Sequence, residues 1–236
     1  MTSIRIQLKK IAKDFSLNYH KKWFIYAGIS KKQEILTEFL SPCPDPLYNK
    51  YGKTIKERLK NLDKFVSSKD FKECCKRFGG AVCTKKGLQN DKKIIKLISN
   101  PLVKKELEAL IKIREKYLAN YDHVAILTRT NIKKEKEWLF KHILMHEWIH
   151  LLLYKNNIKF QKKGARYYAY DEGLCDFFCA LATNNLNKLE LFEEKETYPL
   201  EKSGWTYAIK FRNWLKNCKT SKQRKNKILD IYKKLK

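Results

Sequence analysis

Three histidines and a glutamate lie close together in an otherwise largely apolar stretch, HILMHEWIHLLLY, at residues 142–154. Within it, HEWIH at residues 146–150 has the H-E-x-x-H spacing. Side chains four residues apart project from the same face of a helix, so His146 and His150 can reach one Zn²⁺ while Glu147 leans toward the same side. Polar groups among Leu, Ile and Trp need partners if the helix is buried. The spacing therefore predicts a zinc site on a buried helix.

A third ligand has to come from elsewhere, because two histidines leave a catalytic zinc one protein ligand short, with the last position open to water. No histidine follows His150, but YDEGLCDFFCALA follows at residues 170–182. Glu172 is expected near the start of this second helix, where its carboxylate can complete the metal shell. Asp176, one turn further on, can accept the other ring N–H of a ligand histidine. The alternative is that Glu172 is an N-terminal acid favoured by the helix dipole, with Asp171 as the cap.

HEWIH followed by DEGLCDFF resembles the gluzincin metallopeptidases, especially the families with an E-G-L-A-like glutamate motif and the small minigluzincins, which are peptidase MA-like. The resemblance covers residues 121–186. It implies that His146, His150 and Glu172 bind zinc and that Glu147 is the general base. It also implies that Asp176 bonds to the ring nitrogen of His146 that does not bind the metal. It also implies hydrolysis of a peptide bond by a zinc-activated water.

Several residues near the motif fit the resemblance less closely. Cys175 stands where a small residue is commoner, and Cys175 and Cys179 could compete for zinc, although we expect packed thiols. His142 shares the face of His146 but exceeds the ligand count. A tyrosine would have to stabilise the oxyanion, and the sequence does not single one out. The strand expected at 123–128 stands where gluzincins have an edge strand that pairs with extended substrate.

The apolar patterns predict a mainly helical α+β fold: a zincin-like catalytic domain with a small sheet, an active-site helix and a glutamate helix, plus a helical N-terminal extension. We place the boundary near Asn90, with a basic, mostly helical region at 1–90 and the peptidase domain at 91–236. Strands are expected at 21–29, 79–87 and 122–130. Helices are expected at 54–68, 101–121, 134–154, 171–183, 205–217 and 222–235.

The chain has 236 residues and a formal net charge of +27. A positive field of this size attracts nucleic acid, anionic membranes and acidic proteins alike. Lysine is spread along the whole chain, which favours a Lys-rich proteome over a dedicated nucleic-acid surface. Lysines interrupt every apolar run, so no membrane span is expected. The N-terminus does not resemble a signal peptide, and we expect a cytoplasmic protein with reduced thiols.

The sequence thus predicts a zinc metallopeptidase that acts on a peptide or protein substrate. One alternative is a protease localised to nucleic acid by its charge, as in the Spartan-type proteases, although their third histidine is missing here. A second alternative is a catalytically silent or latent zinc-binding regulatory protein.

Overall fold

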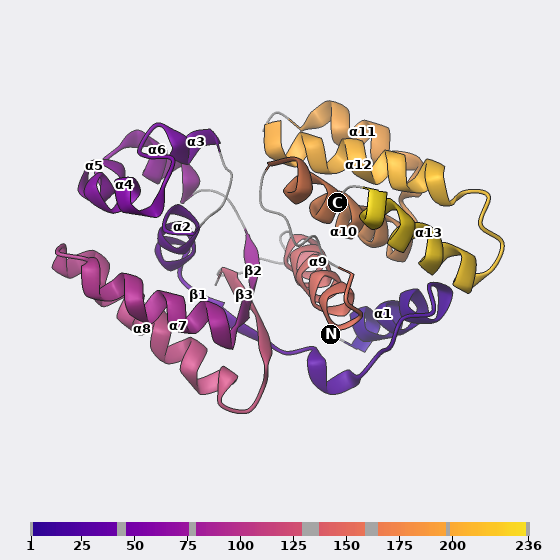
Figure 1. Ribbon diagram of the computed structural model, residues 1–236, viewed down its shortest axis with the longest axis horizontal. Helices are drawn as coiled ribbons and strands as arrows, with labels where there is room; N and C mark the ends of the chain where they lie inside the picture. The colour runs from indigo at the N-terminus through magenta and orange to yellow at the C-terminus, as the bar shows by residue number, and fades with distance from the viewer. Residues whose placement is uncertain are drawn as a thin grey trace. The chain divides into compact units, whose positions relative to one another are not determined.

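A computed structural model of the chain describes residues 2–41, 46–75, 79–128, 137–158, 165–196 and 199–234. The chain forms two compact units (Figure 1). Unit 1 comprises Met1–Lys22 and Trp138–Lys236, and unit 2 comprises Trp23–Glu137. The units do not divide near Asn90, because that residue lies inside helix α7 (Lys85–Ile94) of unit 2. The N-terminal region that we predicted as a separate domain is thus shared between the units.

Unit 2 contains a mixed sheet of three strands, β1 (Tyr26–Ile29), β2 (Gly80–Thr84) and β3 (His123–Thr128). All three lie where the sequence predicted strands. Their order is β1-β3-β2, with β1 parallel and β2 antiparallel to β3. The apolar run of β3 from Val124 to Leu127 is almost completely buried, as expected of a central strand. The prediction of β3 as a substrate-binding edge strand is therefore wrong, because its two edges already pair with β1 and β2.

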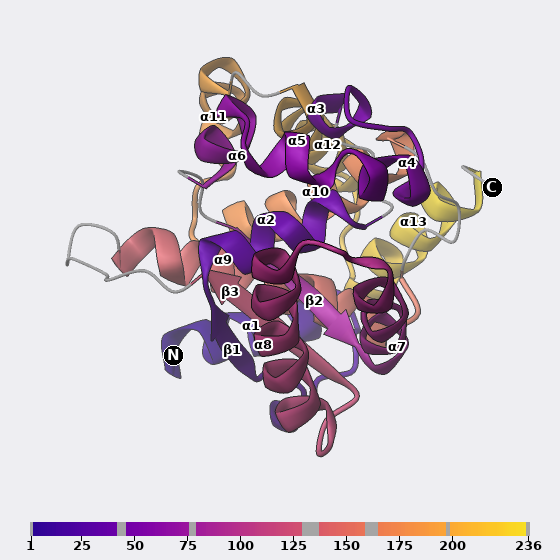
Figure 2. The same ribbon diagram turned by 90° about the vertical axis from the view of Figure 1, so that its left-hand side faces the viewer.

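Helices α2 (Lys31–Phe39), α7 and α8 (Pro101–Leu118) contact the sheet, and Figure 2 shows unit 2 from their side. Four short helices, α3 (Pro46–Asn49), α4 (Ile55–Lys60), α5 (Leu62–Val66) and α6 (Lys69–Cys74), and the 3₁₀ turn η2 (Ile95–Leu97) complete unit 2. The single helix predicted at 54–68 is broken at Asn61, which ends α4 and precedes α5. The side-chain amide of Asn61 donates to the carbonyl of Tyr51 at 2.8 Å, which fixes the break.

The short helices are held together by a buried arginine. Arg58 is 2% exposed, and its guanidinium donates to the carbonyls of Gly52 at 2.8 Å, Ser41 at 3.0 Å and Phe39 at 3.2 Å. Three backbone acceptors from two segments, two at the end of α2 and one after α3, thus share one side chain.

We expect Arg58→Met to destabilise unit 2 by about 3 kcal/mol, because the buried carbonyls would lose their donors. Urea unfolding followed by circular dichroism measures this loss. Lys56→Met, at an exposed position of the same helix, is the matched control and should change stability by less than about 0.5 kcal/mol. Equal stability of the two variants would contradict the role given to Arg58.

Unit 1 is helical. Its elements are α1 (Thr2–Asp14), η1 (Lys21–Trp23, which ends at the unit boundary), α9 (Glu137–Lys155, which begins there), α10 (Ala165–Ala182), η4 (Leu186–Lys188), α11 (Leu189–Lys195), α12 (Pro199–Leu215) and α13 (Ser221–Lys234). Helix α9 is apolar on nearly all sides, which is typical of a buried helix, and Trp148, Ile149 and Leu152 are fully buried. Helices α9 and α10 are each followed by an asparagine in the left-handed region, Asn157 at φ 59° and Asn184 at φ 58°.

The mainly helical fold with a small mixed sheet confirms the predicted α+β class. None of the helices in the described part of the chain is both long and apolar enough to span a bilayer. Helix α10 begins at Ala165, earlier than the predicted start at 171. Glu172 therefore lies in the interior of this helix.

Candidate metal site

Helices α9 and α10 bring together the three predicted ligands. The Nε2 atoms of His146 and His150 are 3.0 Å apart. The Glu172 carboxylate lies 2.9 Å from Nε2 of His146 through one oxygen and 3.4 Å from Nε2 of His150 through the other. Two imidazoles and one carboxylate thus aim their donor atoms at a common point. Imidazole nitrogen and carboxylate oxygen are both zinc ligands, so this donor set fits the ion.

Asp176 lies behind His146. Its Oδ1 is 3.2 Å from Nδ1 of His146, on the opposite side of the ring from Glu172. A carboxylate that accepts from Nδ1 fixes the tautomer in which Nε2 has a free lone pair. The contact predicted between Asp176 and His146 is therefore present, and it orients the imidazole toward Glu172.

The alternative reading of Glu172 as a helix N-terminal acid is wrong. More than one turn of α10 precedes Glu172, so it cannot interact with the first N–H groups of the helix. Asp171 is not a helix cap either, because it also lies inside α10. It accepts a hydrogen bond of 2.8 Å from the hydroxyl of Tyr232 in α13.

A close approach of α10 to α12 sets the position of Glu172. Gly173 faces α12, where a Cβ at this position would lie 2.7 Å from the carbonyl oxygen of Gly204 and 3.0 Å from the nitrogen of Ala208. A Cβ at Gly204 would lie 3.3 Å from Cβ of Glu172. Glycines at 173 and 204 therefore let the two backbones approach, and α12 supports α10 from the side where Glu172 begins.

The two histidines form a network of ion pairs with Glu172 and Asp176. Burial alone would lower the pKa of His146, but bonds to Asp176, Cys179 and Glu172 outweigh it and raise the pKa well above its usual value. Burial likewise opposes the charge on His150, while Cys175 and Glu172 raise its pKa. Burial would raise the pKa of Glu172, but His150 and His146 hold it far below its usual range. In the metal-free protein, Glu172 and Asp176 thus favour a positive charge on the histidine pair, and the histidines favour the anionic form of Glu172.

Cys175 belongs to the same cluster. The ligand atoms of His146, His150 and Cys175 all lie within 4.8 Å of one another. The thiol is fully buried, and burial raises its pKa to about 11, partly offset by His150. The thiol is thus packed, as expected, and it also lies beside the two histidines. The signal was present in the sequence, because Cys175 follows Glu172 by three residues and shares its helix face.

Two other predicted residues lie beside the cluster. Glu147 follows His146 in α9 and is 6% exposed, which is rare for a carboxylate. His142, one turn before His146, is partly buried, and burial and the neighbouring His146 lower its pKa. The charged form of His142 is therefore disfavoured, whereas that of His146 is favoured.

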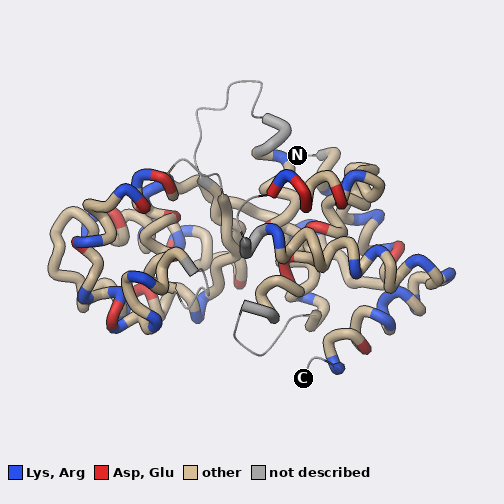
Figure 3. The backbone as a smooth tube through the Cα atoms, turned by 90° about the horizontal axis from the view of Figure 1, so that it is seen from above, with Lys and Arg blue, Asp and Glu red and all other residues tan. Residues whose placement is uncertain are grey.

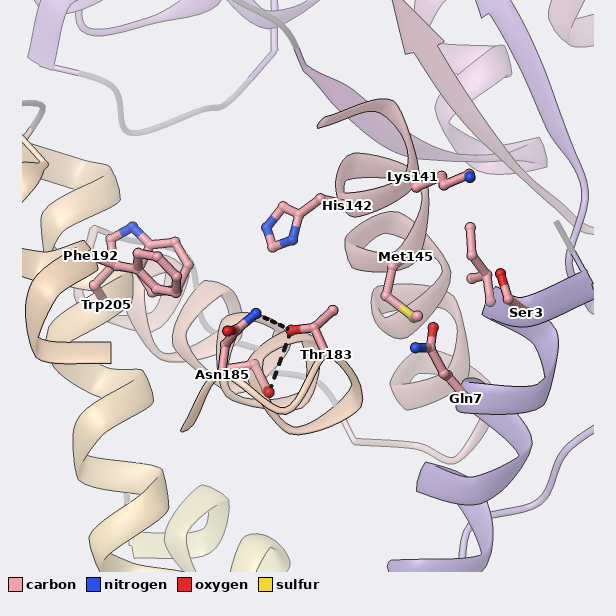
Figure 4. A pocket seen from close by; sticks show the side chains of 11 residues that line it. Ser3, Gln7, Lys141, His142, Met145, Thr183, Asn185, Phe192 and Trp205 are labelled. Atoms are coloured by element: carbon pink, nitrogen blue, oxygen red, sulfur yellow. Dashed lines mark hydrogen bonds between the residues drawn. The ribbon is translucent and has the colours of Figure 1, made fainter. Parts of the chain in front are cut away.

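His142 also forms part of the wall of a pocket of about 530 Å³ within unit 1. Figure 4 shows His142 and Met145 pointing into it from α9, opposite Phe192 and Trp205. The rest of its lining comes from α1, α9, the end of α10 and the turn that follows α10: Ser3, Ile4, Gln7, Lys141, Ala180, Thr183 and Asn185. The lining is mainly apolar. The pocket lies beside the candidate metal site, because His142 is one helical turn from His146 and Ala180 is one helical turn from Asp176. The sequence did not reveal this pocket, because its lining comes from five separate elements.

Lysines and arginines are spread along the helices of both units (Figure 3). Among the described helices, α13 carries six of them with a single acidic residue, Asp230.

Comparisons with known proteins give no match from which a function of the site could be inferred. No protein-family model, no curated protein and no solved structure matches the chain. The resemblance to gluzincins accordingly depends on the motif residues.

Proposed function

We propose that the protein is a zinc metallopeptidase that hydrolyses peptide bonds. The observation that carries the proposal is the convergence of His146, His150 and Glu172 from two helices, with 2.9–3.4 Å between their donor atoms. A buried histidine pair that served only for packing would not need a carboxylate aimed at both rings. The expected zincin-like character of the fold and the choice of zinc belong to the same proposal.

Each residue has a role in the proposed reaction. His146, His150 and Glu172 hold the ion, and Asp176 fixes the tautomer of His146. Zinc, when bound, supplies a water of lowered pKa and polarises the scissile carbonyl. Glu147 accepts the proton of the attacking water and passes it to the leaving amine. The apolar pocket beside His142 is a place for a side chain of the peptide.

Metal analysis and a cleavage assay together test this function. The purified full-length protein should contain one zinc per chain and cleave a generic protein such as casein, and a chelator should abolish cleavage. His146→Ala should lose both zinc and cleavage. Its matched control is His20→Ala, on a histidine in the segment before η1. A wild-type protein that retains no zinc after dialysis against a zinc-containing buffer would refute the proposal.

Asp176→Asn should weaken zinc binding about 10- to 100-fold, because the amide accepts the Nδ1–H bond less strongly and no longer opposes the charge at the metal. Competition with a chromophoric chelator measures the affinity. Asp230→Asn, at an exposed position of α13, is the control. An unchanged affinity in Asp176→Asn would show that this contact does not orient His146.

Zinc binding should release protons at neutral pH. The raised pKa values of His146 and His150 favour protonation of the pair in the metal-free protein, and both rings must be neutral to bind zinc. Apparent affinity should therefore fall as the pH is lowered and level off above the raised histidine pKa values. Titration calorimetry in buffers of different ionisation enthalpy counts the protons. Zinc binding without proton release near pH 7 would contradict the cationic state.

A further inference from the structure

We propose that Cys175 is a fourth metal ligand, which closes the metal site in the resting protein and has to leave the metal before a peptide is hydrolysed. This inference rests on the proposed zinc peptidase function and concerns the regulation of the same site.

The position of the thiol supports a ligand. Cys175 is fully buried on α10, and its sulfur lies within 4.8 Å of the ligand nitrogens of His146 and His150. Cys179 provides an internal comparison, because it is equally buried one turn further along the same helix and bonds to His146 without joining the convergent group. In the described part of the chain, the convergent group consists of His146, His150 and Cys175, and it includes neither Cys179 nor Glu172.

The number of protein ligands determines whether the metal site is open or closed. Glu172 contacts the same two histidine nitrogens at 2.9 Å and 3.4 Å, so two imidazoles, one carboxylate and one thiol would supply the four protein ligands of a closed zinc site. A catalytic zinc keeps one position open, whereas a closed shell is typical of structural sites. The Cys175 thiol loses one proton when its sulfur binds the ion. To reopen the site, the thiolate takes one proton back and leaves, and solvent occupies the position, so no oxidant or reductant is needed.

Cobalt substitution tests the fourth ligand directly. The full-length protein is stripped with a chelator and reloaded with Co²⁺, and its absorption spectrum and cobalt content are recorded. Wild type and Cys179→Ala should show a thiolate-to-cobalt charge-transfer band in the near ultraviolet. Cys175→Ala and the nearly isosteric Cys175→Ser should bind cobalt without that band. With zinc, the two Cys175 variants should cleave casein about tenfold faster than wild type or more.

The outcomes separate this inference from the proposed function. Metal bound without the band in wild type, or a band that survives in Cys175→Ala, overturns the inference and leaves the peptidase proposal intact. A band that depends on Cys175, with no cleavage by any variant, supports the closed shell but refutes the peptidase and the displacement step. If wild type shows the band but neither Cys175 variant binds cobalt, the thiolate cannot be released and the displacement is wrong. No cobalt binding at all overturns both proposals.

Discussion

Glu147→Gln is expected to lower peptide hydrolysis by about 10²- to 10⁴-fold, the range over which a positioned general base acts. The amide has nearly the same shape as the carboxylate but cannot accept the proton of the attacking water. Zinc content should stay at the wild-type level, because Glu147 is not among the proposed ligands. Single-turnover cleavage of casein or a quenched fluorescent peptide, with metal analysis of the same sample, measures both quantities.

Glu194→Gln is the matched control, because it makes the same change at an exposed position of α11. It should cleave like wild type. A Glu147→Gln protein that keeps zinc and cleaves at the wild-type rate would show that another group accepts the proton. Loss of zinc in Glu147→Gln would show that this buried carboxylate is needed to form the metal site.

Gly173→Ala is expected to destabilise the protein by about 3 kcal/mol, the upper part of the range for overpacking, and to weaken zinc binding at the same time. The added Cβ would meet Cβ of Tyr207 as well as the backbone of Gly204 and Ala208. Two of these three atoms belong to the backbone of α12, so the helices have to move apart. Because Glu172 is the preceding residue, its carboxylate would move with α10. Thermal unfolding should show a fall of about 2–4 °C for each kcal/mol.

Gly87→Ala makes the same substitution in α7, where the nearest atoms to the added Cβ are 3.5 Å and 3.9 Å away. This contact is ordinary, and alanine favours a helix over glycine by about 1 kcal/mol, so Gly87→Ala should match wild type or be slightly more stable. Equal stability of the two alanine variants would mean that α10 and α12 can accommodate a Cβ at Gly173.

The sequence was sufficient to predict the local parts of the site. The spacing of His146 and His150 on an apolar helix follows from helical geometry alone, and the same geometry places Glu172 and Asp176 on one face of α10. The three strands were found for a similar reason, because short apolar, β-branched runs bounded by turn residues need no distant information.

Features that depend on distant segments could not be predicted in this way. The central position of β3 depends on pairing with strands far away in the sequence, and nothing in HVAILT distinguishes an edge strand from a central one in such a small sheet. The early start of α10 was missed because the prediction began at the acidic pair Asp171 and Glu172, which resembles a helix start. The division into units was missed because α1 packs in unit 1, where Phe15, the residue after the helix, contacts Phe178 of α10 with 4.6 Å between ring centroids.

The discontinuity of unit 1 has a consequence for synthesis on the ribosome. Helix α1 is made first, yet α9 and α10 emerge only after all of unit 2 has been translated. During that interval the apolar side chains of Ile4, Leu8 and Phe15, which are buried in the finished protein, lack their covering helices. Nascent chains stalled before α9 should therefore recruit chaperones through their first helix, whereas release of the whole chain should end that recruitment.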